Sequence, residues 1–587
     1  MKKIIKIDNE INVKEGGVIF SKEPEGLVSV VGYSQVIETG EYLVDIDYLD
    51  VIGREHKKLR LTRTELFNKK KFCSLIHSKG GVCSNVSYDL MIEKMNENLQ
   101  IPYRGANFDT KDLDGEPVVV PKVVRNIRKI HSTTGFFESE NGLQFRGKNI
   151  QEEGKEIYSD YVGKLGIDNC GDYTVYHEML EHEVLGNIPL ESVMAMAASA
   201  TVLSYANVKW SRKIYNPIFH IFGNSSSGKT TAVQLAVSLG GMPMLSNDQS
   251  LFMTFHSTSD AIMKKIGKNN GFPIAIDEIS MLGNKDITAL IYALAEGIEK
   301  ERLVRAGNKL QDKSEFSTTV FTNGESSIFS RCRQNEGLRY RVFEFGNVIW
   351  TKSAENSNTI KAVVSENYGH VVPKVAKELL ENGDYWEKVF ENWVTKASTD
   401  ERIDKKCKVK IERIAPILGL CMVSAEILTK VLKINFSIID IYNFLFKYLI
   451  QHVCEMANIG ARAYRALFDF YVNNKDSFSV SSCRDPFRYI GKGDYGMVFE
   501  ISKPKFINDV KYDRCLIFTQ ERFRTLVEGF GFEDVDVVLH QLKDDGLLMT
   551  KDKSRAYAKM IINDEECKVN RVLIPEANYD LNIDDDE

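Results

Sequence analysis

The residues best suited to chemistry lie in the segment GNSSSGKTT, residues 223–231. It matches the pattern G-x-x-x-x-G-K-[ST], and it lies between an apolar run and a helix-like run, the strand–loop–helix context of a phosphate-binding loop. Two glycines let the backbone approach phosphate closely without a Cβ clash. The pattern therefore predicts binding of a nucleoside triphosphate. The predicted nucleotide-binding residues are Gly223, Ser225, Ser226, Ser227, Gly228, Lys229, Thr230 and Thr231.

Individual positions of this loop have separate expected tasks. The amides of residues 225–229 and the start of the following helix are expected to point at phosphate oxygens. Lys229 is placed to reach the β and γ phosphates, and the Thr230 hydroxyl to bind Mg²⁺. A structural glycine turn before a helix does not require Lys followed by Thr. ATP and Mg²⁺ are therefore the predicted substrate and metal.

An acidic pair follows downstream in GFPIAIDEIS. Asp277 and Glu278 end a predicted strand, and ligands of open α/β sheets bind at that end. We expect Asp277 to hold Mg²⁺ and Glu278 to polarise the attacking water. An acidic pair at a strand end is common by itself, so this assignment depends on the phosphate loop upstream.

The next predicted strand, in STTVFTNGESS, ends in Thr322 and Asn323. An amide at this strand end can orient the attacking water against the γ phosphate, and we predict that role for Asn323. The alternative is structural, because Asn323-Gly324 is also a good turn dipeptide.

Four arginines follow in SRCRQNEGLRYRVFEF. Ring ATPases place an arginine of one subunit on the γ phosphate bound by the neighbouring subunit, where it stabilises transition-state charge. Arg341 and Arg333 are the favoured candidates for this finger. One of the four, Arg331, Arg333, Arg339 and Arg341, is expected to be the finger, and surface solvation explains the other three equally well.

These side chains must be positioned by the alternating α/β block between residues 215 and 345. Its short apolar runs, 218–222, 273–276, 318–321 and 342–345, are separated by helix-like segments, as in a parallel sheet buried on both faces. The N-terminal hundred residues alternate with period two, which predicts a β-rich α+β domain. GFFESENGLQFRGK suggests a hairpin, and MAMAASATVL reads as a buried helix.

The expected fold class is multidomain α/β, since 587 residues are too many for one core. The predicted parts are 1–110, an N-terminal β-rich domain; 111–190, a connecting and helical collar region; 191–350, the ATPase core; 351–456, a helical region; 457–580, a winged-helix domain; and 581–587, an acidic tail.

Composition limits the class of protein. Apolar content of 43% and charged content of 27% are ordinary for soluble globular protein. No apolar run approaches the roughly 18 residues of a membrane span, and the N-terminus does not read as a signal peptide. Ten scattered cysteines indicate reduced thiols, and we expect a cytoplasmic protein without a membrane partner. The net charge of −6 excludes a wholly basic surface but allows a local basic channel.

The order of these motifs resembles superfamily 3 helicases, a branch of the AAA+ ATPases. In that family a β-hairpin between the acidic pair and the asparagine lines the central pore of a ring. The resemblance implies a homo-oligomer, a hexamer, moving on single-stranded DNA. The hairpin would be RLVRAGNKLQDKS, with Arg302, Arg305, Lys309 and Lys313 facing DNA phosphates. The alternative is a solvated basic loop.

A closer resemblance extends from about Gly135 to Phe345. TGFF, HIFGNSSSGKTT, IAIDEIS, YALAEGIEKERLVR, FTNGE and GLRYR are similar to a family from phages and mobile elements, long catalogued as a domain of unknown function. That family includes the replication initiator helicases of staphylococcal pathogenicity islands and cassette chromosomes. YALAEG departs from the glycine-lysine-rich form expected there. The resemblance implies an ATP-dependent helicase of replication initiation.

Two further segments offer alternatives. Asp45 and Asp47 alternate on one strand, as in two-metal primases, and His77 could complete such a site; acids on an exposed strand face need no function. The competing class of protein is an AAA+ NTPase that remodels or signals in defence without unwinding, and a non-enzymatic origin-binding protein is a third class. The segment 489–500 matches a kinase glycine loop, but the other kinase motifs do not follow, so it is read as a turn.

The C-terminal helices and strands suggest a winged helix-turn-helix. Its predicted duplex-DNA contacts, at the origin of replication, are Lys543, Lys551, Lys553 and Arg555. Wings often follow DNA phosphates, but such domains also bind proteins.

Overall fold

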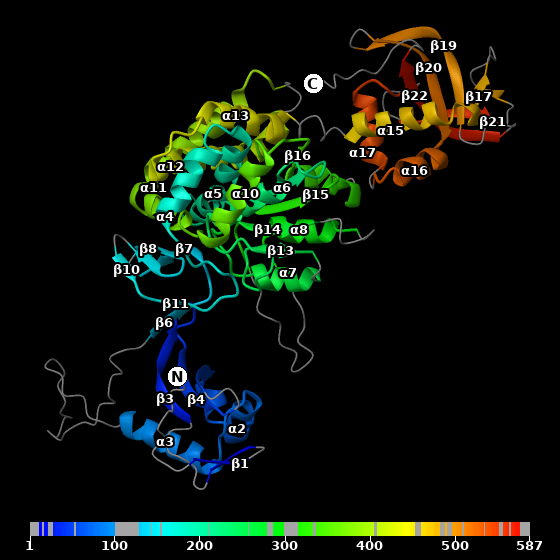
Figure 1. Ribbon diagram of the computed structural model, residues 1–587. Coiled ribbons are helices and arrows are strands. Elements are labelled where there is room, and N and C mark those ends of the chain that lie inside the picture. The colour runs from blue at the N-terminus through cyan, green and yellow to red at the C-terminus, as the bar shows by residue number, and fades with distance from the viewer. Residues whose placement is uncertain are drawn as a thin grey trace, which may run out of the picture. The chain divides into compact units, whose positions relative to one another are not determined.

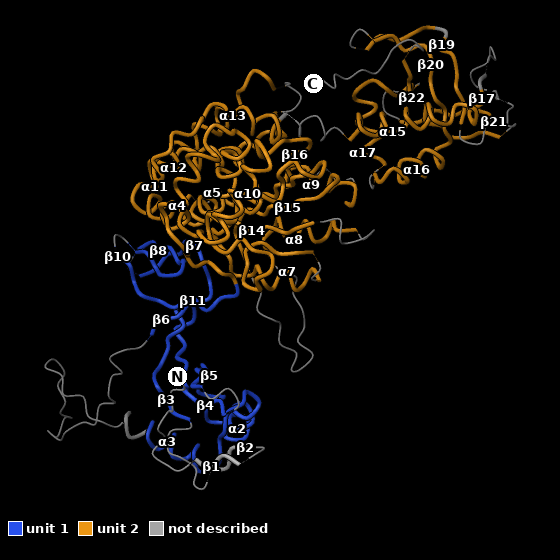
Figure 2. The backbone as a smooth tube through the Cα atoms, viewed as in Figure 1, with its two compact units in different colours: residues 1–164 blue, residues 165–587 orange. Residues whose placement is uncertain are grey.

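The structure is a computed structural model, and the chain divides into two compact units, residues 1–164 and 165–587 (Figure 2). The described residues are 11–14, 17–20, 28–51, 55–99, 128–140, 142–152, 155–210, 212–255, 258–278, 286–298, 315–332, 336–403, 408–451, 459–481, 488–489, 496–507, 510–532, 535–550, 556–562 and 565–575.

The first unit contains the β-rich fold expected from the period-two pattern. Its main sheet has the order β11-β6-β3-β4-β5, in which the three longest strands form an antiparallel meander. The three strands of the meander are β3 (Val28–Val36), β4 (Tyr42–Asp50) and β5 (Glu55–Thr62). The other two strands of the sheet are β6 (Arg128–His131) and β11 (Asp160–Tyr161). Their apolar face packs into a core with Phe72 and Ile76. The helices are α1 (Arg63–Leu66), α2 (Lys69–Ser78) and α3 (Asn85–Leu99).

Two smaller sheets complete this unit. The hairpin predicted from GFFESENGLQFRGK is confirmed, and it extends into a four-stranded antiparallel sheet. Its strands are β7 (Gly135–Ser139), β8 (Gly142–Arg146), β9 (Ile150–Glu152) and β10 (Lys155–Ile157). A separate hairpin pairs β1 (Ile11–Lys14) with β2 (Gly17–Phe20).

The second unit is built around a five-stranded sheet of order β13-β14-β15-β12-β16, in which every pair is parallel. The strands are β12 (Ile218–Phe222), β13 (Phe252–Thr254), β14 (Ile274–Asp277), β15 (Val320–Gly324) and β16 (Val342–Gly346). The central parallel sheet is therefore confirmed. The sequence missed β13 because three residues, FMT, are too short a run to show a pattern.

The register of this sheet brings the predicted site residues to one edge. Ile221 of β12 pairs with Asn323 of β15, and Ile276 of β14 pairs with Thr322. The residues that follow β12, β14 and β15 therefore meet at the carboxyl edge of the sheet. Short helices flank the strands: α6 (Lys229–Ser238), α7 (Ser259–Ile266), α8 (Thr288–Glu296), η3 (Ile328–Arg331), α9 (Glu336–Arg339) and α10 (Ala354–Glu366).

A helical layer packs against the sheet (Figure 1). At its centre α5 (Ile188–Lys209) contacts α6, α11, α12 and α13. The predicted burial of MAMAASATVL is confirmed, since every residue from Leu190 to Ala206 is buried. The other elements are α4 (Tyr173–Met179), η1 (Leu180–Val184), α11 (Val372–Thr399), α12 (Lys408–Leu432), α13 (Ile438–Phe446) and η5 (Lys447–Gln451).

Among the described residues, α5 and α12 are long and apolar enough to cross a membrane by length and composition alone. Within the fold, 89% and 72% of their most apolar windows are buried. Core helices of soluble proteins have the same property, so this finding is weak evidence of a membrane span.

The C-terminal part has its own core around a six-stranded sheet of order β17-β19-β20-β22-β21-β18. Two of its strands are β21 (Ala558–Ile562) and β22 (Glu565–Pro575). The long β19–β20 hairpin was not predicted; the kinase-like segment runs into it at Gly496, and residues 490–495 lie outside the described ones. The remaining elements are α15 (Ile459–Asn473), η6 (Lys475–Ser477), β17 (Phe478–Ser481), β18 (Arg488–Tyr489), β19 (Gly496–Ile507), β20 (Val510–Thr519), α16 (Gln520–Gly529) and α17 (Val535–Asp544).

Candidate functional site

The loop between β12 and α6 has the backbone geometry of an anion cradle. Gly223, Ser226 and Gly228 have φ values of 134°, 71° and 84°. Gly228 is the N-cap of α6 in the left-handed conformation, and it makes no side-chain cap. The first amides of α6 therefore keep their positive dipole end for an anion rather than for a capping side chain.

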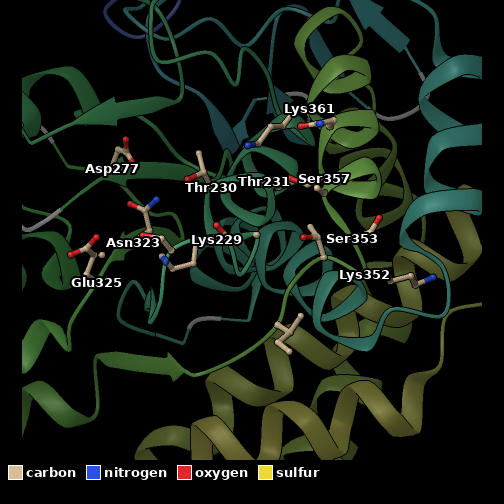
Figure 3. A pocket seen from close by; sticks show the side chains of 18 of the residues that line it. Lys229, Thr230, Thr231, Asp277, Asn323, Glu325, Lys352, Ser353, Ser357 and Lys361 are labelled. Carbon is tan, nitrogen blue, oxygen red and sulfur yellow. Dashed lines mark hydrogen bonds between the residues drawn. The ribbon is translucent and has the colours of Figure 1, made fainter.

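A cavity of about 670 Å³ opens beside this loop at the carboxyl edge of the sheet (Figure 3). The predicted residues that line it are Ser225, Ser226, Gly228, Lys229, Thr230, Thr231, Asp277, Glu278 and Asn323. Gly223 and Ser227 do not line it. Their carbonyl oxygens instead accept hydrogen bonds, from Lys229 Nζ at 2.8 Å and from the Trp350 amide at 2.8 Å.

Lys229 lies folded along the loop. Its ammonium donates to the Gly223 and Asn224 carbonyls at 2.8 and 2.6 Å. Burial lowers the pKa of this ammonium, and the nearby Glu325 carboxylate opposes that shift. The charge is thus held in the cavity by weak carbonyl acceptors, for which phosphate oxygens are stronger replacements.

Asn323 joins the two acidic residues of the neighbouring strand. Its Oδ1 accepts from the Glu278 amide at 2.8 Å, and Glu278 is held at a φ of 53°. Burial raises the pKa of Asp277, and a hydrogen bond from Asn323 opposes the shift. Asn323 and Gly324 both lie within β15, so the alternative of a turn at this dipeptide is wrong.

A buried histidine, His220, forms hydrogen bonds with residues on both sides of Asn323. His220 Nε2 lies 3.0 Å from the Ser326 carbonyl, and Nδ1 lies 2.8 Å from the Thr322 hydroxyl. A carbonyl only accepts, so Nε2 carries the proton and Nδ1 accepts from Thr322. Burial lowers the pKa of His220 to about 4, which keeps the ring neutral at ordinary pH. His220 therefore fixes the backbone on both sides of Asn323.

Thr230 and Asp277 fit a magnesium ion. Both line the cavity and offer a hydroxyl and a carboxylate oxygen, the hard donors that Mg²⁺ prefers. The described residues hold no cluster of three or more His, Cys, Asp or Glu side chains suited to a metal. This suits Mg²⁺, which typically takes one or two protein ligands and completes its shell with phosphate oxygens and water.

The sequence missed one wall of the cavity, which comes from the segment after β16 and from α10. A polar i, i+4, i+8 spacing of Ser353, Ser357 and Lys361 could have revealed this face. The lining residues not anticipated are Gly324, Glu325, Ile349, Thr351, Lys352, Ser353, Ala354, Ser357, Asn358 and Lys361.

Among the described residues, the candidate arginine fingers do not line the cavity. Arg341 directly precedes β16, so it lies at the amino edge of the sheet, away from the cavity. Its guanidinium donates to the Gly337 carbonyl at 2.7 Å and stacks over Tyr215 and Tyr292. Arg339 is only 4% exposed, over the Phe329 ring, and burial lowers its pKa to about 9.

Several predicted residues lie outside the described ones. They are Arg302, Arg305, Lys309, Lys313, Arg333, Lys551, Lys553 and Arg555.

The two aspartates of β4 are engaged by neighbouring side chains. Asp45 accepts from Arg60 Nε at 2.8 Å and from the Ser34 hydroxyl at 2.7 Å. Asp47 lies 2.6 Å from His56 Nδ1. His77 Nε2 accepts from the Cys83 amide at 3.2 Å, which is a local structural bond. These contacts explain the aspartates without metals, so the primase alternative gains no support.

Comparison with known proteins places the fold. Residues 133–314 match a domain of unknown function, DUF927. A solved structure of Cch from SCCmec type IV, described as an active helicase, has a TM-score of 0.69 and 21% identity, covering 97% of each chain. The resemblance expected from the sequence is thus confirmed at the level of the fold. The apo C-terminal region of NrS-1 also matches, with a TM-score of 0.20 and 10% identity over 72% of this chain and 91% of that one. No curated protein matches.

Proposed function

We propose that this protein is an ATP-dependent DNA helicase that acts in replication of a mobile element or phage. One observation carries the proposal: the phosphate loop, the acidic pair and Asn323 all line one cavity. Together they offer the groups that nucleotide hydrolysis needs, which are phosphate ligands, metal ligands and a site for the attacking water. The similarity to Cch, an active helicase, supports the choice of DNA unwinding among the uses of ATP.

Each side chain then has a task at the phosphates. Lys229 and the α6 amides bind the β and γ phosphates, and Thr230 and Asp277 hold Mg²⁺, which neutralises developing charge. Glu278 polarises the attacking water. Asn323 orients that water and fixes Glu278 through its amide.

The first experiment replaces Lys229 by Ala. ATP turnover should fall at least about 100-fold, because the lysine contributes both to phosphate binding and to transition-state charge. The melting temperature should stay close to that of the wild type, since the hydrogen bonds of Lys229 go to carbonyls of its own loop. Turnover that survives the substitution would contradict a nucleotide-driven enzyme.

A second experiment separates unwinding from hydrolysis. The segment RLVRAGNKLQDKS, residues 302–314, with Arg302, Arg305, Lys309 and Lys313, is proposed to contact single-stranded DNA in the pore of a homohexamer. The Arg305→Ala, Lys309→Ala double variant should lose strand separation in a forked-duplex assay and keep most of its DNA-independent ATPase. Loss of both activities together, or intact unwinding, would favour a remodelling or signalling NTPase.

The C-terminal part is proposed to be a winged helix that binds origin duplex DNA. Two helices, α16 and α17, precede β21 and β22, and β22 pairs with both β20 and β21, the strand arrangement of that fold. Lys543 lies at the end of α17. The expected compartment is the cytoplasm.

A further inference from the structure

The helix α10 presents a continuous polar face to the cavity. Ser353, Ser357 and Lys361 recur at intervals of four residues, which places them on one side of a helix. All three line the cavity beside the phosphate loop. Ser353 also caps α10, with its hydroxyl accepting from the Asn356 amide at 3.1 Å. This face begins at an ordered helix end and runs for two turns along the cavity.

This face is fastened directly to the phosphate loop. The hydroxyls of Thr231 and Ser357 are 2.6 Å apart, which joins α6 to α10. The Trp350 amide donates to the Ser227 carbonyl at 2.8 Å. Thr351 lies so close to Gly228 that a Cβ there would come within 2.5 Å of its Oγ1. These contacts therefore fix the position of α10 relative to the phosphate loop.

Lys361 brings a positive charge to this wall. It is half-buried, and among the described residues it has no hydrogen-bond or ion-pair partner. Figure 3 shows Lys361 and Lys229 on opposite sides of Thr231. A half-buried ammonium without a counter-charge is poorly solvated, and an anion entering the cavity would supply that counter-charge.

Charge balance favours phosphate as that anion. A nucleoside triphosphate carries more negative charge than one lysine and one Mg²⁺ neutralise, and the described lining holds three carboxylates, those of Asp277, Glu278 and Glu325. We infer that Lys361 is a second phosphate-contacting cation, supplied by the same chain from α10, opposite Lys229. This inference rests on the proposed function, because it needs a nucleotide in the cavity.

The test measures the affinity of fluorescent ADP and ATP analogues for the full-length chain. Lys361→Gln should weaken both about tenfold, the loss of one charge-assisted contact. Lys361→Arg should restore most of the affinity. Lys388→Gln is the matched control: this lysine is exposed on α11 and is not among the residues that line the cavity. It should bind both analogues as the wild type does.

Affinity of Lys361→Gln within twofold of the wild type would overturn the inference, as would an equal loss in Lys388→Gln. A melting temperature measured for each variant excludes unfolding as the cause. The Lys229→Ala variant distinguishes the two claims. If it binds nucleotide normally, the proposed function fails; if it loses binding while Lys361→Gln keeps it, only the role of Lys361 fails.

Discussion

At the scale of single residues, Asn323 would link the proposed hydrolysis to backbone conformation. Its carbonyl oxygen holds the Glu278 amide at 2.8 Å, and Glu278 has a φ of 53° that non-glycine residues rarely adopt. Without this bond the peptide can relax to an extended conformation, which would carry the Glu278 carboxylate away from the attacking water. In the proposed mechanism, Asn323 would thus position Glu278 as well as orient the water.

Asn323→Ala should therefore lower kcat for ATP about 10- to 100-fold, with KM changing by less than about threefold. The loss falls on kcat because the amide acts on the reacting water and not on the bound phosphates. Steady-state ATPase measured with single-stranded DNA checks this. A raised KM with unchanged kcat would assign Asn323 to ground-state binding instead.

The residues that line the cavity could be predicted where their spacing along the chain is characteristic of a nucleotide site. Lys229, Thr230 and Asp277 follow from local patterns, and Asn323 from motif order. Lys361 was not predictable, because it reaches the cavity only through the packing of α10 on α6. Glu325 was missed because a lone acid after a strand has no distinctive spacing.

At the scale of elements, the junction between the phosphate loop and the segment after β16 is tightly packed. Gly228 has a φ of 84°, and an added Cβ would meet Thr351 at 2.5 Å. Gly186 has a similar φ of 78°, with nothing within 4 Å of the added Cβ. Substituting each glycine by alanine therefore distinguishes two costs. At Gly186 only backbone strain is expected, whereas at Gly228 a steric clash with Thr351 is added.

Gly186→Ala should cost about 1 kcal/mol of unfolding free energy, the strain of a left-handed non-glycine residue. Gly228→Ala should cost about 1–3 kcal/mol more, because it also overpacks against Thr351. Urea unfolding of the two variants measures the difference. Equal losses would show that Thr351 yields without cost, and would weaken the argument that α10 is fixed to the loop.

The end of α11 is held by a charged network that responds to pH. Asp400, the C-cap, accepts two bonds from Arg402 at 2.6 and 2.8 Å and one from the Tyr442 hydroxyl of α13 at 2.8 Å. Bonding from Arg402 lowers the pKa of Asp400 to about 2. A depressed carboxyl pKa stabilises the fold above its unfolded value near 3.8, and that contribution is lost as pH falls towards 2.

Asp400→Asn should cost about 2 kcal/mol at pH 7. The gap between the two proteins should narrow as pH falls from about 4 to about 2, because the wild-type carboxyl becomes protonated. Urea unfolding at pH 7, 5 and 3.5 follows this trend. A gap that is constant with pH would assign the loss to packing rather than charge.

Element types were largely predictable, because periodicity reports burial. The parallel strands read as continuous apolar runs, and the N-terminal strands as alternating ones. The β19–β20 hairpin was missed because its polar outer half, SKPKFINDVKYD, has no clean alternation.

At the scale of the whole molecule, Arg341 is the feature that bears on assembly. It lies at the amino edge of the sheet, opposite the cavity of its own chain. In the proposed ring of identical subunits, we expect an arginine so placed to serve the neighbouring site. The proposed hexamer therefore predicts that each active site combines residues of two chains.

Mixing two inactive variants tests this arrangement. Lys229→Ala and Arg341→Ala should each lack ATPase alone. Co-assembled, they should recover part of it, because some interfaces pair an intact Lys229 with an intact Arg341. No recovery, while mixed rings are seen by native mass spectrometry, would mean that Arg341 acts only within its own chain or only in folding.

The helix α5 sets a limit on how this fold can diverge. Since no residue from Leu190 to Ala206 reaches the surface, the helix has no side on which substitutions can accumulate neutrally. Its small residues admit α6, α11, α12 and α13 closely, so a larger side chain there needs a smaller one opposite. Relatives that keep this architecture should therefore change α5 and its neighbours in compensating pairs, a covariation signal that an alignment can measure without any assay.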